Sequence, residues 1–174
     1  MTPGPSAPLP GLVVTLEEVP PEGLERPLNV PPRALAALVA GDGEAPPDLV
    51  GALTGTLRLR RLGARLEVRG SFQVEAALAC DRCLAPATAA LTGEIEESLP
   101  LAVAGRAEEA EEDALVVTDG QVDLAGLLAE SFWLAWPYRF ICRPDCAGLC
   151  PVCGADLNQG ACGCPKMVSA SGTP

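Results

Sequence analysis

The chain of 174 residues contains no histidine, a single lysine (Lys166) and very few aromatic side chains (3%). Without histidine it lacks the most common general base and the most common nitrogen ligand for metals. It also has no Gly-x-Ser-x-Gly elbow and no glycine-rich phosphate loop. No stretch approaches the roughly 18 uninterrupted apolar residues of a membrane span. We therefore expect no enzyme, no small-molecule substrate and no membrane partner.

The N-terminus shows no secretion signal, because no basic segment is followed by an apolar one. Eight cysteines in 174 residues are also too sparse for a disulfide scaffold. We therefore expect a cytoplasmic protein, since clustered cysteines in a reducing compartment bind metal more often than they form disulfides.

The net charge of −11 is unevenly distributed along the chain. Six arginines and three acids lie between residues 58 and 82, a balance of +3, whereas eleven acids and Arg106 alone lie between residues 93 and 130, a balance of −10. A local basic stripe can meet phosphate, although the overall charge repels nucleic acid at long range. Residues 104–113 are predicted to form a solvated acidic loop.

Apolar and polar residues alternate from residue 53 onward, which is typical of antiparallel strands with one polar face. Gly63 predicts the first turn, and Gly70 a bulge or a second turn. Further strands are expected at residues 12–16, 86–99 and 115–117. Residues 18–49 are rich in proline and are expected to be mostly irregular, apart from one or two helical turns at 32–39.

An amphipathic helix is predicted near residues 123–136, with Asp123 as its N-cap and Pro137 after its end. Its expected apolar face comprises Leu124, Leu127, Leu128, Phe132, Leu134 and Ala135. Trp133 and Trp136 are expected to pack rather than to stack on bases.

The fold class is therefore α+β: a mainly antiparallel sheet (a meander) with one C-terminal amphipathic helix and a cysteine-rich zinc lobe. We expect a disordered lead-in at 1–10 and a sheet domain at 11–140. A zinc-binding lobe packed on that domain is expected at 141–165, followed by a disordered tail at 166–174.

The cysteines carry the clearest chemical signal. Six of them fall within residues 142–164, and one more Cys-x-x-Cys pair lies upstream in the connection between two predicted strands. Short-spaced pairs of thiolates give zinc two halves of a tetrahedral site, so four pairs predict two structural zinc ions. The predicted ligands are Cys80, Cys83, Cys142, Cys146, Cys150, Cys153, Cys162 and Cys164.

We favour one site from the first four cysteines and a second from the last four, although spacing alone leaves cross-braced pairings open. Disulfides, an iron–sulfur cluster and a redox-active Cys-x-x-Cys are the alternatives. The cysteine spacing does not match ferredoxin patterns, and the surrounding sequence is not a βαβ unit. If all eight thiolates bind metal, no coordination position remains open for activated water.

Three segments together resemble the bacterial YceD family, described as large ribosomal RNA subunit accumulation proteins. They are Cys80-Asp-Arg-Cys83-Leu84, the helix that opens at Asp123-Leu124 and ends in a Trp-Pro step, and the run from Cys142-Arg-Pro-Asp-Cys146 through Cys150-Pro-Val-Cys153 to Asn158. The resemblance covers about residues 50–164. It implies a cytoplasmic accessory factor for processing or accumulation of large-subunit rRNA, with no known catalytic activity.

The family's gene commonly lies beside that of a small zinc-binding ribosomal protein, which fits a role in assembly. Family members usually continue past the last cysteines with an Asp-Pro-Arg segment and a final helix, whereas this chain continues with Pro165-Lys-Met-Val-Ser. Any contact that the family makes through this helix is therefore not carried over to this chain.

The leading hypothesis is a non-catalytic ribosome-biogenesis factor that binds pre-rRNA or an assembling ribosomal protein. An acidic chain favours a basic protein partner. A zinc-handling protein that serves a zinc-binding ribosomal protein is the alternative, and a redox enzyme a third. Candidate contacts for RNA or a partner are Arg58, Arg60, Arg61, Arg65, Arg69, Arg82, Arg139 and Arg143, for which a solvated strand face is the competing interpretation.

Overall fold

The computed structural model describes residues 9, 11–40, 47–103 and 114–165. The chain divides into two compact units, which are described separately. The sheet unit comprises residues 1–77 and 88–137, and the cysteine unit comprises residues 78–87 and 138–174. The tail predicted at 166–174, the acidic loop predicted at 104–113 and all of the lead-in except residue 9 lie outside the described residues.

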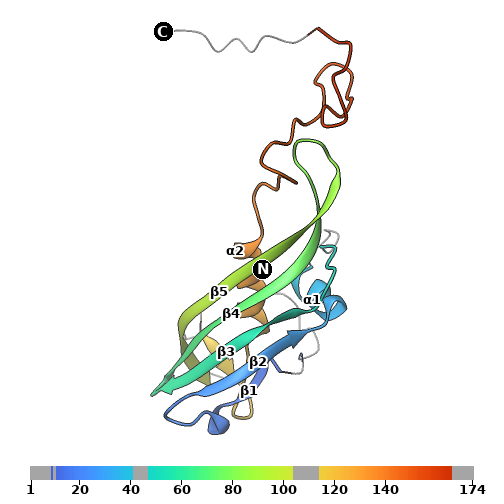
Figure 1. The fold of residues 1–174 in the computed structure, drawn as a ribbon. Helices are drawn as coiled ribbons and strands as arrows, with labels where there is room; N and C mark the ends of the chain where they lie inside the picture. The colour runs from blue at the N-terminus through green and yellow to red at the C-terminus, as the bar shows by residue number, and fades with distance from the viewer. Residues whose placement is uncertain (1–8, 10, 41–46, 104–113, 166–174) are drawn as a thin grey trace, which may run out of the picture. The chain divides into compact units, whose positions relative to one another are not determined.

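A five-stranded sheet forms the body of the sheet unit, in the order β2-β3-β4-β5-β6 (Figure 1). The strands are β2 (Leu24–Val30), β3 (Leu53–Leu62), β4 (Arg65–Ala79), β5 (Pro86–Val103) and β6 (Leu115–Val117). β3 pairs antiparallel with both β2 and β4, whereas β6 pairs parallel with β5. The predicted mainly antiparallel sheet is confirmed, with β6 as the exception to the meander.

A second, two-stranded sheet pairs β1 (Val13–Thr15) antiparallel with β7 (Gln121–Asp123). A short 3₁₀ turn, η1 (Leu16–Glu18), follows β1. This small sheet therefore brings the start of the described chain next to the segment that leads into the second helix.

The alternation of residue types on β3 and β4 sets the two faces of the sheet. Leu57, Leu59, Leu66 and Val68 are at most 2% exposed, so one face belongs to the core. Burial of each such side chain stabilises the fold by roughly 1.5–3 kcal/mol. A two-residue turn at Gly63 joins the strands, with φ +60 and pairing of Leu62 with Arg65 on either side. The predicted first turn is thus confirmed.

Gly70 does not form the predicted bulge or turn. It lies within β4, opposite Leu57 in an unbroken register. A Cβ at this position would lie 2.2 Å from the Thr56 carbonyl oxygen and 2.9 Å from Cδ2 of Leu57. Glycine is needed here because the two backbones approach closely, which is the other common reason for glycine inside a strand.

β2 overturns the prediction that residues 18–49 are mostly irregular. All of its residues pair in register with β3, with Leu28 and Val30 buried on the core face. Pro27 is tolerated because β2 is an edge strand, where a missing N–H does not break an internal ladder. Arg26 holds the strand by donating to the Val13 carbonyl oxygen at 3.3 Å and the Glu18 carboxylate at 2.9 Å.

Two helices in the sheet unit contact each other: α1 (Pro32–Val39) and α2 (Ala125–Ala135). α1 confirms the predicted helical turns. At the start of α2, the Asp123 carboxylate accepts a hydrogen bond from the Ala125 N–H at 2.8 Å, although Leu124 occupies the N-cap position itself. In the described ranges, no helix has the length and apolar character needed to cross a bilayer.

The face that α2 buries differs from the predicted one at its C-terminal end. Leu128, Ser131 and Phe132 are buried, whereas Leu134 is 88% exposed. At 100° per residue, Leu134 points about 200° away from Phe132, so the two cannot share a face. The Phe132, Trp133 and Trp136 rings lie with centroids 5.4–5.6 Å apart, which agrees with a packing role for the tryptophans.

Candidate metal centres

The eight cysteines gather into two groups of four within the cysteine unit, and all eight are free thiols. The first centre contains Cys80, Cys83, Cys142 and Cys146, and the second contains Cys150, Cys153, Cys162 and Cys164. In each centre the four sulfurs lie within 4.8 Å of one another. This is the grouping that we favoured from spacing, and the cross-braced pairings are not adopted.

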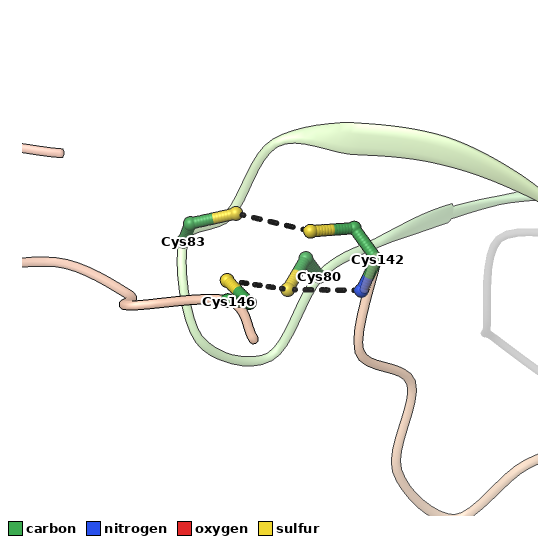
Figure 2. Close-up of side chains that lie close together, drawn as sticks. All are labelled: Cys80, Cys83, Cys142 and Cys146. Atoms are coloured by element: carbon green, nitrogen blue, oxygen red, sulfur yellow. Dashed lines mark hydrogen bonds between the residues drawn. The ribbon is translucent and has the colours of Figure 1, made fainter. Parts of the chain in front are cut away.

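The sulfur geometry of the first centre fits a tetrahedral metal ion. The Cys80 and Cys146 sulfurs are 3.9 Å apart, and those of Cys83 and Cys142 are 3.8 Å apart (Figure 2). Zinc–sulfur bonds of about 2.3 Å place the corners of a tetrahedron roughly 3.8 Å apart. The residues present could therefore hold an ion such as Zn²⁺ with four thiolates.

The connection between β4 and β5 forms the first knuckle, residues 80–85. The Cys80 N–H donates to the Ala85 carbonyl at 3.0 Å, and the Leu84 N–H donates back to the Cys80 carbonyl at 2.8 Å. Leu84 adopts φ +59, the left-handed conformation that most side chains avoid. The Arg82 N–H also points at the Cys80 sulfur, at 3.4 Å. This tight turn aims both thiols of the pair to one side.

The segment from residue 138 onward brings the other two ligands of the first centre. The Asp81 N–H donates to the Phe140 carbonyl at 2.9 Å, and the Phe140 N–H donates to the Asp81 carboxylate at 2.6 Å. The Cys142 N–H then reaches the Cys80 sulfur at 3.4 Å (Figure 2). A backbone link thus joins the two segments immediately before Cys142.

Three of the four thiols of the first centre are buried. Cys80 is 0%, Cys146 2% and Cys83 8% exposed, whereas Cys142 is exposed. The apolar side chains packed against it are those of Ala85, Ile141 and Leu149. A metal ion bound there would be shielded from water on most sides.

The thiols of the first centre differ in their pKa values. The Cys142 N–H lowers the pKa of the Cys80 thiol from 9.0 to about 6, while burial raises the pKa of Cys142 to about 12. Within this centre the Cys80 thiol therefore gives up its proton more readily than the Cys142 thiol.

The second knuckle, residues 150–155, repeats the turn of the first. The Cys150 N–H donates to the Ala155 carbonyl at 2.8 Å, and the Gly154 N–H donates to the Cys150 carbonyl at 2.9 Å. Gly154 has φ +72, so glycine takes the position that Leu84 occupies in the first knuckle. The Cys153 and Val152 N–H groups lower the pKa of the Cys150 thiol to about 6. The neighbouring Cys153 thiol raises the pKa of Cys164 to about 12.

The second centre is more open than the first. Cys150 is 6% exposed, but Cys153 is exposed and the other two ligands are half-buried. An apolar hollow of 310 Å³ borders its sulfurs. Beside Cys150, Cys162 and Cys164, the hollow is lined by Pro151, Val152, Leu157, Ala161 and Pro165.

Asn158 lies between the centres, and sequence reasoning assigned it no role. Its Oδ1 accepts hydrogen bonds from the Ala147 N–H and the Arg143 guanidinium, both at 2.8 Å. Its Nδ2 faces the Cys146 sulfur at 3.6 Å and the Asp156 carboxylate at 2.7 Å. The Asn158 backbone N–H, followed by its side chain, lowers the pKa of Asp156. The only sequence signal was its place at the end of the cysteine motif.

The arginines proposed for RNA or partner contact fall into two sets. Five lie on the sheet unit: Arg58, Arg60, Arg61, Arg65 and Arg69. Arg58 and Arg69 face each other across β3 and β4, and each lies near a glutamate: Glu25 at 3.9 Å and Glu96 at 3.1 Å, respectively. Arg60 pairs in register with Glu67. The sheet face therefore mixes cations with carboxylates.

Of the five candidate arginines on the sheet unit, the remaining two form hydrogen bonds near the β3–β4 turn. Arg61 donates to the Gly63 carbonyl at 3.3 Å, and Arg65 donates to the Ser98 hydroxyl at 3.1 Å.

The remaining three arginines belong to the cysteine unit. Arg82 donates to the Cys146 carbonyl at 3.0 Å, and Arg143 lies 3.5 Å from the Asp145 carboxylate in addition to its bond with Asn158. Arg139 is exposed. Arg82 and Arg143 thus support the first centre, a structural role that the sequence did not indicate.

Comparison with known proteins gives relatives in mycobacteria. The chain is 30% identical over 131 residues to an uncharacterized protein of Mycobacterium tuberculosis and to one of Mycobacterium bovis, a match covering 75% of this chain and 60% of each relative. An uncharacterized protein of Mycobacterium leprae is 28% identical over 102 residues, 58% of this chain and 47% of the relative. The chain thus spans 60% or less of the length of these relatives.

No solved structure matches the chain. A family model described as "Large ribosomal RNA subunit accumulation protein YceD" matches residues 68–171. The matched segment runs from near the start of β4 past the last cysteine and so includes both tetracysteine centres. The chain therefore belongs to the YceD family.

Proposed function

We propose that the protein is a non-catalytic, cytoplasmic ribosome-biogenesis factor that supports processing and accumulation of large-subunit rRNA. The observation that carries this proposal is the family match over residues 68–171. Large ribosomal RNA subunit accumulation is the role named in the family's description.

Two structural zinc ions, one in each tetracysteine centre, would hold the cysteine unit together. The sulfur separations of 3.8 and 3.9 Å in the first centre suit zinc with four thiolate ligands. Four thiolates close the coordination sphere, so such an ion supplies folding energy rather than activated water. Each ion contributes on the order of 10 kcal/mol to folding.

The partner would be pre-rRNA or an assembling ribosomal protein, and charge favours the protein. The sheet-face arginines have carboxylates beside them, at 3.1 Å for Arg69 and 3.9 Å for Arg58. A phosphate backbone would have to displace these carboxylates, whereas a basic protein meets a chain of net charge −11. Ribosomal proteins, which bind RNA, are typically basic.

Co-purification from cells, at low and at moderate salt, tests the proposal. We expect large-subunit precursors to be recovered with the protein, and deletion of the gene to lower the level of large-subunit rRNA. Substitution of Arg58, Arg60 and Arg69 by glutamine distinguishes the two partners. Loss of RNA from the purified material would point to pre-rRNA, and unchanged recovery to a ribosomal protein. Absence of ribosomal material even at low salt would overturn the proposal.

A zinc-handling role is a second candidate, favoured by the openness of the second centre. Cys153 is exposed, and an apolar hollow is lined by the other three cysteines. Zinc-isotope exchange measured by native mass spectrometry distinguishes the two functions. A zinc-handling protein should exchange one of its two ions within minutes and pass it to an apo ribosomal protein. A purely structural role predicts retention of both ions.

A further inference from the structure

The side chain of Asn158 uses its full hydrogen-bonding capacity. Its oxygen accepts two hydrogen bonds, from Ala147 and Arg143, and its amide nitrogen donates toward Cys146 and Asp156. An amide side chain has two acceptor lone pairs and two N–H donors, so the set is complete. The Ala147 N–H can only donate, which fixes the orientation of the amide. The residue is therefore held in one position.

Asn158 contacts the first centre from a loop that belongs to the second. Cys146 is a buried ligand of the first centre, 2% exposed. Asn158 and Asp156 lie in residues 154–161, the loop between the ligands Cys153 and Cys162 of the second centre. The Asn158 backbone N–H also donates to the Asp156 carboxylate at 2.9 Å, so that loop positions the amide. One side chain thus connects the loop of one centre to a sulfur of the other.

We propose that Asn158 couples the two tetracysteine centres, so that the cysteine unit binds its two metal ions cooperatively. This inference rests on the metal binding in the proposed function. The N–H···S hydrogen bond stabilises the negatively charged Cys146 thiolate, the form that binds metal. The bond forms only when residues 154–161 are folded, and an ion bound between Cys153 and Cys162 folds them. Occupation of the second centre therefore strengthens binding at the first.

Thermodynamic linkage makes the coupling reciprocal: the first ion strengthens binding of the second by the same factor. Loss of an outer hydrogen bond to a metal ligand typically lowers metal affinity 10–100-fold. The same factor is expected for each centre when Asn158 is replaced. A purely local role for Asn158 would change only the first centre.

The Asn158→Ala variant should still fold, because backbone contacts between the two loops remain. The Leu157 N–H donates to the Gly148 carbonyl at 2.9 Å, and Leu149 and Asp156 form an antiparallel bridge. Gln159→Ala is the matched control. Gln159 is the next residue and donates to the other Asp156 carboxylate oxygen at 3.2 Å, and within the described residues its side chain makes no hydrogen bond to a sulfur.

A double-mutant cycle with Co²⁺ as the probe tests the coupling on the full chain. The charge-transfer absorption of thiolate-bound Co²⁺ reports metal binding directly. Vacating the second centre with Cys153→Ser and Cys164→Ser should lower Co²⁺ affinity at the first centre 10–100-fold. In the Asn158→Ala background the same pair of substitutions should have a much smaller effect, since only the backbone contacts at Gly148 and Leu149 still link the two loops. An equal loss in both backgrounds, or none in either, would overturn the inference.

A second measurement needs no vacated centre. Chelator titration of the zinc-loaded chain, with cysteine alkylation mapped by mass spectrometry, gives the retention of each centre. Asn158→Ala should weaken retention at both centres by a similar factor, while Gln159→Ala should leave both unchanged. A change confined to the first centre would reject coupling but leave the proposed function intact. Failure of the wild-type chain to bind Zn²⁺ or Co²⁺ at all would overturn the metal assignment itself.

Discussion

The two knuckles of the cysteine unit share one backbone design but have different surroundings. Each consists of Cys-x-x-Cys, a residue with positive φ and an alanine whose carbonyl accepts the first cysteine's N–H, at 3.0 Å for Ala85 and 2.8 Å for Ala155. In each, the pKa of the first thiol is lowered to about 6 by backbone N–H groups. In the second knuckle the main N–H groups, those of Cys153 and Val152, belong to the turn itself, whereas in the first the main donor is the Cys142 N–H, which lies outside the turn.

The centres differ in what surrounds the knuckle. The first joins cysteines 59 to 66 positions apart and buries three of its four ligands. The second takes all its cysteines from residues 150–164, and Cys153 is exposed. The local turn sets the geometry of the thiols, whereas the residues packed around them decide how well an ion is shielded. We expect the first centre to hold its ion more firmly.

Removal of metal should give the largest effect. With increasing chelator, the second centre should lose its ion first, and loss of both should unfold the cysteine unit, because each ion contributes on the order of 10 kcal/mol. Site-resolved alkylation, read by mass spectrometry, should modify Cys153 before Cys80. Both tryptophans belong to the sheet unit, so their fluorescence should change little. Earlier modification of Cys80, or loss of the tryptophan signal with the metal, would contradict this comparison.

Substitutions at the third position of each knuckle should have a smaller effect on stability than metal removal, and a different effect in each knuckle. Arg82 donates to the Cys146 carbonyl at 3.0 Å, while Val152, its counterpart in the second knuckle, is 55% exposed. Arg82→Ala should lower the free energy of unfolding of the zinc-loaded protein by about 1.5 kcal/mol, the lower end for a charge-assisted hydrogen bond. Val152→Ala should change it by less than about 0.5 kcal/mol. Urea denaturation measures the free energy of unfolding of both variants. Equal effects would show that the surroundings of the two knuckles do not differ at this position.

The fold could be predicted where local pattern and pairing agree. The β3–β4 hairpin followed from alternation and Gly63, and the grouping of the cysteines followed from the spacing of the pairs. β2 was missed because Pro27 suggests irregular structure unless the strand is known to be an edge. The parallel pairing of β6 with β5 could not be predicted, because alternation of residue types does not give the direction of a strand. These are tertiary facts that a single sequence does not contain.

The grouping of the cysteines was predictable, but the residues that support the two groups were not. The type and spacing of the cysteines indicate metal binding directly. Asn158 and Arg82 act instead through contacts with Cys146, which lies 12 and 64 positions away from them. Either residue on a loop is more often solvated than structural, so residue type gives no signal. Likewise, nothing in the sequence sets Leu84 apart from other leucines. Only its φ of +59 shows that it occupies a left-handed position that usually favours glycine.

This last difference gives the smallest and most local test, at the left-handed position of each knuckle. Gly154 has φ +72, and a Cβ there would meet nothing within 4 Å, so Gly154→Ala tests the backbone alone. The expected cost is about 1–2 kcal/mol, that of a left-handed alanine. Gly163→Ala is the matched control, since its added Cβ also meets nothing within 4 Å and no positive φ is involved. It should be neutral or slightly stabilising.

The reverse change at the first knuckle should act in the opposite direction. Leu84 is 65% exposed, so Leu84→Gly loses little packing and relieves the left-handed strain. The greater flexibility of glycine in the unfolded chain offsets part of the gain, leaving about 0.5–1 kcal/mol of stabilisation. Urea denaturation of the zinc-loaded variants measures both signs. Destabilisation by Leu84→Gly would show that the leucine side chain contributes a contact outweighing the strain, and the two knuckles would then differ in their turns as well as in their surroundings.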